Sequence, residues 1–141
     1  MHIAGQILNA GVADADALLI DEPLSFWGGF DPETGTIIDR QHPQVGETMT
    51  GKIIVMPGSR GSSGTPGVLG EALRLKTGPC GIILSKADIN VTAAALVVAT
   101  LYDQHCPVIA IAEAQFDELT QALRRSKEPH LRIGVDGSVS F

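Results

Sequence analysis

The chain has 141 residues, of which 44% are hydrophobic and 18% charged, with a formal net charge of −6. This length and apolar content suit one folded domain spanning residues 1–141 and exclude a disordered protein. The acidic balance, without any basic run, argues against nucleic acid or an anionic membrane surface as a partner.

The first third of the chain predicts strands and a long loop. Residues 2–8 and 17–20 predict two strands. Residues 21–50 show little periodicity and contain several glycines and prolines. Within them, 31–35 predicts a turn and 36–38 a short extended segment. Because long irregular segments are uncommon in compact domains, this one is expected to be functional.

The middle of the chain alternates between apolar strands and helices, and its end is β. Thr65 predicts the N-cap of the first helix, with Pro66 after it, and Asn90 or Asp88 the cap of the second. This alternation is typical of a parallel sheet with packed helices. The predicted strands are 52–56, 80–84 and 107–112, the helices 68–75, 91–102 and 114–125, and the closing hairpin 131–135 with 138–141.

Cysteine usage and apolar patterning indicate a cytoplasmic protein. Cys80 and Cys106 belong to no CxxC or Cys/His cluster, which is typical of reduced core thiols rather than metal ligands. No basic segment followed by an apolar one begins the chain, and the apolar stretch 93–101 is too short to span a bilayer. Neither a targeting segment nor a membrane partner is expected.

The loop 57–67 lies between a predicted strand and a predicted helix. It contains four glycines, two prolines, four hydroxyl side chains and one cation, Arg60. Backbone N–H groups and the positive end of a helix dipole favour an anion at such a place. An ordinary turn-rich helix start explains the same composition, so this alternative stays open.

Other motifs are weaker. Residues 46–52 match the start of a P-loop, but Ile53 replaces the required Ser or Thr and a strand follows instead of a helix. A turn entering a strand is therefore expected there. The serines of the loop lack nucleophile-elbow spacing, and the four histidines show no triad relation.

Two positions in the irregular segment keep alternative interpretations. His42 could be a ligand or an acid/base group, although a loop histidine is more often neither. Trp27 and Phe26 could form a lid or docking surface, or could be buried against the sheet.

Several segments, taken in order, resemble the small subunit of aconitase X. The resemblance extends from the first strand to Pro107 and Val108. It implies an α/β fold, a swivelling β/β/α domain with a barrel-like sheet and packed helices, equivalent to the mobile domain of aconitase. The similar segments are 22–35, His42 with Pro43, 51–55, Pro57 with 60–63, and 68–71.

The resemblance also implies a hydro-lyase made of two chains. The large subunit of this family carries an iron–sulfur cluster or iron, and neither Cys80 nor Cys106 matches a family ligand. We therefore expect no cofactor on this chain, a heterodimer with a large subunit, and no activity without it. The bacterial branch dehydrates cis-3-hydroxy-L-proline to a pyrroline-2-carboxylate, and the archaeal branch acts on mevalonate 5-phosphate. The loop 57–67 is more similar to the bacterial one.

Dehydrating a 3-hydroxy acid needs a base for the Cα proton and an acid for the leaving hydroxyl. The resemblance implies that Ser62 is the general base, activated by surrounding N–H groups and the helix start. Arg60, Gly61, Ser63 and Gly64 are expected to bind the small hydroxy-acid substrate. Gly64 stands where the matching aconitase segment has an arginine.

Three alternatives remain at this stage. The chain could be the small subunit of a mevalonate 5-phosphate dehydratase, a non-catalytic swivelling module that binds a carboxylate or phosphate, or a fragment of a single-chain enzyme. In the preferred interpretation the loop is half of an active site, and residues 26–30 lie with it at the subunit interface.

Overall fold

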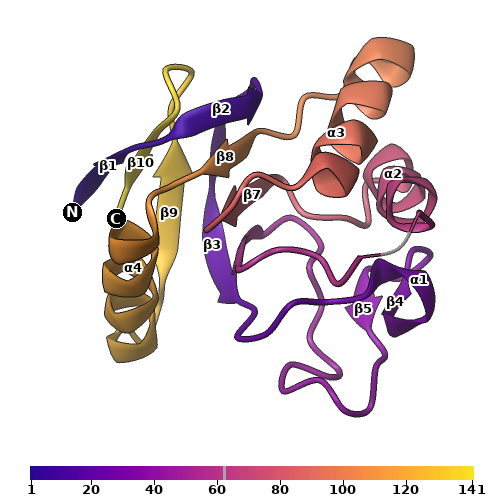
Figure 1. Cartoon of the computed structure of the whole chain (residues 1–141), viewed down its shortest axis with the longest axis horizontal. Helices are drawn as coiled ribbons and strands as arrows, with labels where there is room; N and C mark the ends of the chain where they lie inside the picture. The colour runs from indigo at the N-terminus through magenta and orange to yellow at the C-terminus, as the bar shows by residue number, and fades with distance from the viewer. Residues whose placement is uncertain (62) are drawn as a thin grey trace.

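The computed structural model describes residues 1–61 and 63–141, and its main element is an eight-stranded sheet that nearly closes into a barrel (Figure 1). The strand order is β1-β10-β9-β3-β6-β7-β8-β2. These strands are β1 His2–Ala4, β2 Gln6–Asn9, β3 Ala13–Leu19, β6 Ile53–Met56, β7 Gly81–Leu84, β8 Val108–Ala110, β9 His130–Ile133 and β10 Ser138–Ser140.

Helices and a small ribbon surround this sheet. They are α1 Phe26–Gly29, α2 Thr65–Leu75, α3 Ile89–Tyr102, α4 Glu113–Arg125, and the two-stranded pair β4 Phe30–Asp31 and β5 Thr36–Ile37. The predicted helices and strands of the middle and end of the chain are confirmed. The predicted turn at 31–35 is confirmed as well, because the Gly35 N–H donates to the Asp31 carbonyl over 2.8 Å.

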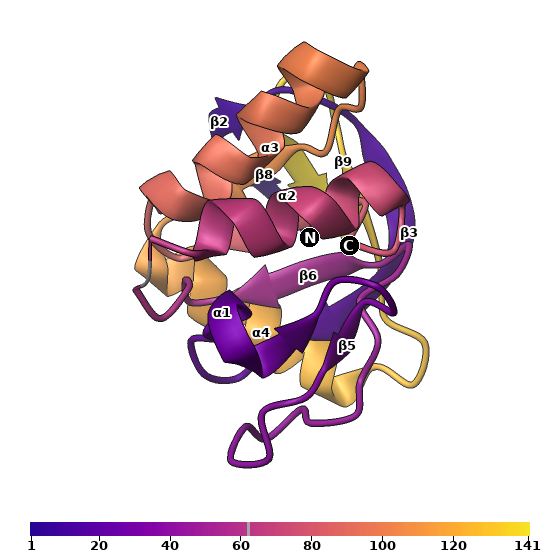
Figure 2. The ribbon, with the colours of Figure 1, turned by 90° about the vertical axis from the view of Figure 1, so that its right-hand side faces the viewer.

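Four neighbouring strands, β3, β6, β7 and β8, run parallel. Every residue of β6 and β7 is buried, which explains their continuous apolar sequence, since a parallel strand is covered on both faces. α2 and α3 lie side by side across one face (Figure 2) and pack onto Ile54 and Ile82. On the other face Ile53 and Ile83 join a second core, into which α4 inserts Phe116 and its neighbours.

The sheet closes through Gly5. A single strand was expected at 2–8, but Gly5 divides it: β1 pairs with β10 and β2 with β8, so one segment supplies both edges of the sheet. The Gly5 N–H donates to the Gly137 carbonyl over 3.1 Å. A Cβ at Gly5 would lie 2.1 Å from Cγ2 of Ile109 and 3.0 Å from the Gly137 oxygen, so no side chain fits.

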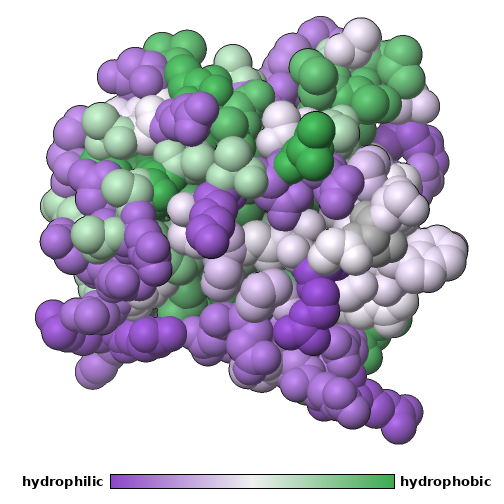
Figure 3. Space-filling model, viewed as in Figure 1, coloured by the Kyte–Doolittle hydropathy of each residue, from purple (hydrophilic) through white to green (hydrophobic). Residues whose placement is uncertain are grey.

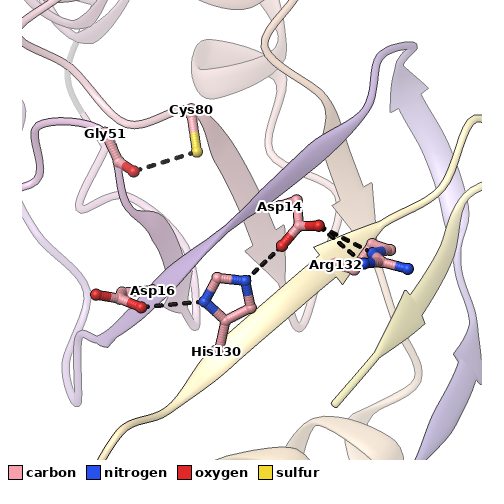
Figure 4. A network of polar contacts seen from close by, with 6 residues as sticks. All are labelled: Asp14, Asp16, Gly51, Cys80, His130 and Arg132. Carbon is pink, nitrogen blue, oxygen red and sulfur yellow. Dashed lines mark hydrogen bonds and ion pairs between the residues drawn. The ribbon is translucent and has the colours of Figure 1, made fainter.

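The strand expected at 17–20 is wrong in its extent, because β3 starts at Ala13. Aspartates have low strand propensity, which hid the first half of the strand. Cross-strand partners compensate: Asp14 is paired with Arg132, and Asp16 with His130, on antiparallel β9. These side chains form an exposed network on the outside of the sheet (Figure 4).

His130 lies between two carboxylates in this network. Its Nε2 contacts Asp14, and its Nδ1 lies 3.0 Å from Oδ1 of Asp16. These hydrogen bonds, to Asp16 and then Asp14, raise the pKa of His130. Hydrogen bonds from His130 and then Arg132 lower the pKa of Asp14.

The closure at Gly5 predicts a steric cost. Gly5→Ala is expected to lower the free energy of unfolding by about 1–3 kcal/mol, the usual range for overpacking. Gly67→Ala is the matched control, because a Cβ there meets no described atom within 4 Å and Gly67 lies inside α2, where alanine is favoured by about 0.5–1 kcal/mol. Urea unfolding of both variants measures the difference, and equal stabilities would contradict the steric argument.

The His130 network predicts a pH-dependent contribution to stability. Because the folded-state pKa of His130 is raised, its contribution is complete below the ordinary histidine value of about 6.5 and is lost as pH rises through the raised value. Asp14, whose pKa is lowered, contributes above about 3.9 and loses its contribution as pH falls through the lowered value. His130→Asn is therefore expected to lower the unfolding temperature at pH 5.5 and to have less effect at pH 8.5.

Thermal unfolding at low salt measures this effect, and high salt should weaken it, because the groups are exposed. The same substitution in an Asp14→Asn, Asp16→Asn background is the control and should lose most of its pH dependence. An unchanged pH dependence in that background would assign the effect to another group.

Candidate active site

The carboxyl ends of β3, β6, β7 and β8 meet at one edge of the sheet, and α2, α3 and α4 follow β6, β7 and β8 from that edge. Ligands of open α/β sheets bind outside the carboxyl ends of parallel strands. Three pockets of about 300 to 360 Å³ adjoin there, and all of them include Ser85, the residue after β7.

One of these pockets, of about 360 Å³, lies between the start of the 57–67 loop and the start of α3. Its lining is Pro23, Pro57, Gly58, Ser59, Ser85, Lys86, Ala87 and Asp88. The neighbouring pocket, of about 300 Å³, contains the ion pair between Arg124 of α4 and Asp21, at 2.7 Å. The hydrogen bond from Arg124 holds the pKa of Asp21 below its usual range, and Gln44 adds a second one.

Asp88 connects the loop to α3. Its Oδ2 accepts hydrogen bonds from the backbone N–H and the hydroxyl of Ser59, both over 2.7 Å. Its Oδ1 accepts from the N–H groups of Asn90 and Val91, so Asp88 is the N-cap of α3. Of the two residues expected to cap this helix, Asp88 does so.

The loop is also held by the irregular segment. The Arg60 N–H donates to the Leu24 carbonyl over 2.9 Å, and Leu24 and Ser59 form an isolated parallel bridge. Leu24 is fully buried in the first core. The chain therefore enters residues 60–64 from a fixed backbone position.

At the other end of the loop, Gly64 lies under the indole of Trp27. A Cβ at Gly64 would lie 3.0 Å from Cε3 and 3.1 Å from Cδ2 of that ring, so a side chain would displace it. Trp27 is 67% exposed, whereas Phe26 is fully buried, with its ring centroid 5.3 Å from that of Phe30. Of the two alternatives for this aromatic pair, burial applies to Phe26, which belongs to the core. Trp27 instead lies on the surface beside the loop.

The structure brings the described members of the predicted substrate-binding set together in this loop. Arg60, Gly61 and Ser63 are exposed, and Gly64 is half-buried at the start of α2. Among the described residues, the side chain of Arg60 has no ion-pair partner. Ser62, the predicted general base, lies outside the described residues.

The expected N-cap of α2 is wrong by one residue. Gly64 is the N-cap and Thr65 is already helical, with Pro66 next, as is usual for a helix start. The Thr65 side chain is fully buried, so it turns away from the solvent-facing position of a cap. Among the described residues, its hydroxyl has no hydrogen-bond partner.

His42 has a structural role. Its buried ring contacts the Glu22 carbonyl through Nε2 over 3.0 Å, and its Nδ1 accepts from the Gln44 N–H over 3.1 Å. These contacts fold the 21–50 segment on itself and occupy both ring nitrogens. The P-loop-like stretch is a turn, as expected, because Gly51 has a φ of 68° and β6 begins at Ile53.

The cysteines lie at the opposite edge of the parallel sheet. Both line a pocket of about 350 Å³ that contains none of the predicted site residues. Burial raises the pKa of both thiols, strongly for the buried Cys106, so neither favours the thiolate form that metals bind. Within residues 1–61 and 63–141, no group of three or more His, Cys, Asp or Glu could hold a metal ion. The described residues therefore do not fit an iron centre.

Sequence reasoning missed the part that Asp88 plays in the loop. A signal was available, since Ser85, Lys86 and Asp88 directly follow a buried strand, where the ends of parallel strands gather polar site residues. The pairing with Ser59 could not be inferred, because it depends on β6 and β7 being neighbours.

No described helix is long and apolar enough to cross a bilayer.

Comparisons with known proteins agree on one family. A model of the aconitase X swivel domain matches residues 2–138. A cis-3-hydroxy-L-proline dehydratase from Hypocrea jecorina is 35% identical over 86% of this chain, which spans only 20% of that protein. A phosphomevalonate dehydratase small subunit from Pyrococcus horikoshii is 38% identical over 69% of this chain and 72% of its own length.

The fold is similar to that of a solved relative. The crystal structure of aconitase X from Thermococcus kodakaraensis in its holo-form superposes with a TM-score of 0.80 and 26% sequence identity. The match covers 99% of this chain and 97% of the other. The swivelling α/β fold expected from the sequence is thereby confirmed.

The contact between Trp27 and Gly64 predicts a fluorescence change. Gly64→Val should displace the indole and increase its quenching by acrylamide, and should lower the free energy of unfolding by about 1 kcal/mol, because Gly64 is the N-cap of α2 and valine is a poor N-cap. Trp27 is the single tryptophan of the chain, so the signal is unambiguous. Gly61→Ala is the control, because no described atom lies within 4 Å of its Cβ position. Equal quenching in both variants would contradict the contact.

Proposed function

The chain belongs to the aconitase X swivel-domain family, and from this we propose that it is the small subunit of a cytoplasmic, heterodimeric hydro-lyase. The observation that carries the proposal is the 57–67 loop, which presents Arg60, Gly61 and Ser63 to solvent at the carboxyl ends of the parallel strands. A loop that is fixed at Ser59 and exposed to solvent at Arg60, Gly61 and Ser63 suits a site that a second chain completes.

A larger partner is supported by two further features. The chain spans about a fifth of the length of a dehydratase that it matches, so the activity named for that relative belongs to a much longer protein. In addition, α3 is apolar on its outer side, which forms part of the green area at the upper right of Figure 3. Its large exposed apolar and aromatic side chains are Ile89, Leu96, Val97, Leu101 and Tyr102. A helix that is apolar all round is normally covered, and we propose that the large subunit covers this one.

We propose cis-3-hydroxy-L-proline as the substrate. Two relatives with this activity in their names, from Hypocrea jecorina and Pseudomonas aeruginosa, match 86% and 83% of the chain. Mevalonate 5-phosphate is the second candidate, favoured by the archaeal small subunit, which is itself a short chain. A non-catalytic module that binds a carboxylate or phosphate and a fragment of a single-chain enzyme are the remaining alternatives.

In the proposed reaction the Cα–H bond breaks, its electron pair forms the new double bond, and the C3–O bond breaks. The hydroxide leaves as water after taking up a proton, and the enamine formed tautomerises to the pyrroline-2-carboxylate. We propose Ser62 as the base that accepts the Cα proton. Arg60 would bind the substrate carboxylate, and the N–H groups of 61–64 at the start of α2 would stabilise negative charge. Iron or an iron–sulfur cluster, which would assist hydroxide departure, is proposed to belong to the large subunit.

Reconstitution tests this proposal. The chain is purified with its large subunit under conditions that supply iron, and is assayed with cis-3-hydroxy-L-proline and with mevalonate 5-phosphate. We expect turnover of hydroxyproline by the complex and none by either chain alone. Ser62→Ala should lower kcat by about 10²- to 10⁴-fold, the range for loss of a general base. Ser63→Ala is the matched control and should keep a far larger share of the activity.

Other outcomes would change the assignment. Turnover of mevalonate 5-phosphate alone would favour the second substrate. Normal turnover by Ser62→Ala would remove that residue from the chemistry. An isolated chain that binds a carboxylate or phosphate tightly, and that associates with no larger chain, would favour the binding module.

A further inference from the structure

Asp88 occupies a position that the resemblance to aconitase X did not assign. It follows β7 in the short connection to α3 and forms part of the pocket beside the 57–67 loop. In all of its side-chain hydrogen bonds with the described residues Asp88 is the acceptor, and these bonds are divided between its two oxygens. Oδ1 binds the start of α3, and Oδ2 binds Ser59.

The α3 side of this arrangement is rigid. The first turn of α3 is fixed by the Asp88 cap and by Thr92, whose hydroxyl donates to the Asp88 carbonyl over 2.7 Å. Val91, Ala94 and Ala95 then bury one face of the helix in the first core. The carboxylate is consequently held in place by well-packed structure before it contacts the loop.

The loop side depends on this carboxylate. Oδ2 receives two donors from one residue, the N–H and the hydroxyl of Ser59, each over 2.7 Å. Hydrogen bonds to a charged group are short and stronger than neutral ones. The next residue, Arg60, is bonded through its N–H to Leu24. Two successive residues are therefore fixed immediately before the exposed part of the loop.

We propose that Asp88 is the positioning residue of the site: it links the fixed start of α3 to Ser59 and so positions the part of the loop that carries Arg60 and Gly61. This inference rests on the proposed function, since it concerns the efficiency of that reaction. Asp88 itself touches no reacting atom in this assignment. It acts through Ser59, whose N–H and hydroxyl both donate to Oδ2 of Asp88.

A purely structural role, capping of α3, makes a different prediction. Asparagine is about as good an N-cap as aspartate, so Asp88→Asn retains the bond to the start of α3. The amide cannot satisfy both sides, however, because its single oxygen replaces two acceptors and its NH₂ group would face the backbone N–H of Ser59, which cannot accept a hydrogen bond, although the Ser59 hydroxyl can. Asp88→Asn thus separates positioning from capping.

Two measurements on the full chain and on the complex test the proposal. Amide hydrogen exchange by NMR reports on the Ser59 N–H, and steady-state kinetics report kcat and KM of the reconstituted dehydratase. In Asp88→Asn we expect faster exchange at Ser59, a protected start of α3, and a fall in kcat of about tenfold to a hundredfold, as when a catalytic group is misplaced by about 1 Å.

Ser59 variants keep the test independent of folding defects. Ser59→Ala removes the hydroxyl contact and should lower kcat by less than Asp88→Asn does. Ser59→Thr restores a hydroxyl and should recover most of the activity. Asp136→Asn is the matched control, because Asp136 likewise accepts a backbone N–H, from Ser138, in a hairpin away from the loop. It should leave kcat unchanged.

The outcomes are distinguishable. Normal kcat in Asp88→Asn, or unchanged exchange at Ser59, would overturn the positioning role. Activity that follows the unfolding temperature across all variants, with no recovery in Ser59→Thr, would assign Asp88 to stability alone and overturn it as well. No dehydratase turnover by the unsubstituted complex would instead refute the proposed function.

Discussion

The parallel strands β3, β6, β7 and β8 impose the constraint on which the remaining structure depends. β6, β7 and β8 are buried along their whole length and require cover on each side, and α2 with α3 supply it on one face while the barrel interior and α4 supply it on the other. Because each helix follows its strand through a loop or short connection at the strand's carboxyl end, three helices begin at one edge. The polar residues that follow β6 and β7 therefore lie side by side, although nearly thirty residues separate Ser59 from Asp88 in the sequence.

The irregular segment 21–50 completes this edge of the sheet. It buries Phe26 and Leu24 in the first core, and these residues hold the backbone that contacts the loop at Arg60. Trp27 remains exposed above Gly64. The residues proposed to contact substrate are thus carried by a short stretch with fixed supports on both sides, which is how a loop site is made geometrically reproducible.

Much of the fold could be predicted from the sequence, and the exceptions have physical causes. β6, β7 and the three long helices follow from apolar runs and periodicity, and were correct to within a few residues. The start of β3 was missed because Asp14 and Asp16 are poor strand formers until Arg132 and His130 lie opposite them. Thr65 was misplaced by one residue, because its burial in the core, invisible in the sequence, decides which residue caps α2.

The sequence by itself determined the composition of the loop, its place between a strand and a helix, and the family to which the ordered motifs belong. Only the tertiary structure decided that Asp88 holds Ser59, that Phe26 is buried while Trp27 is exposed, and that Gly5 closes the sheet. Local patterns report the period and propensity of single elements. These three decisions depend instead on which strands become neighbours, and that is set by covering both faces of one sheet with a limited number of helices.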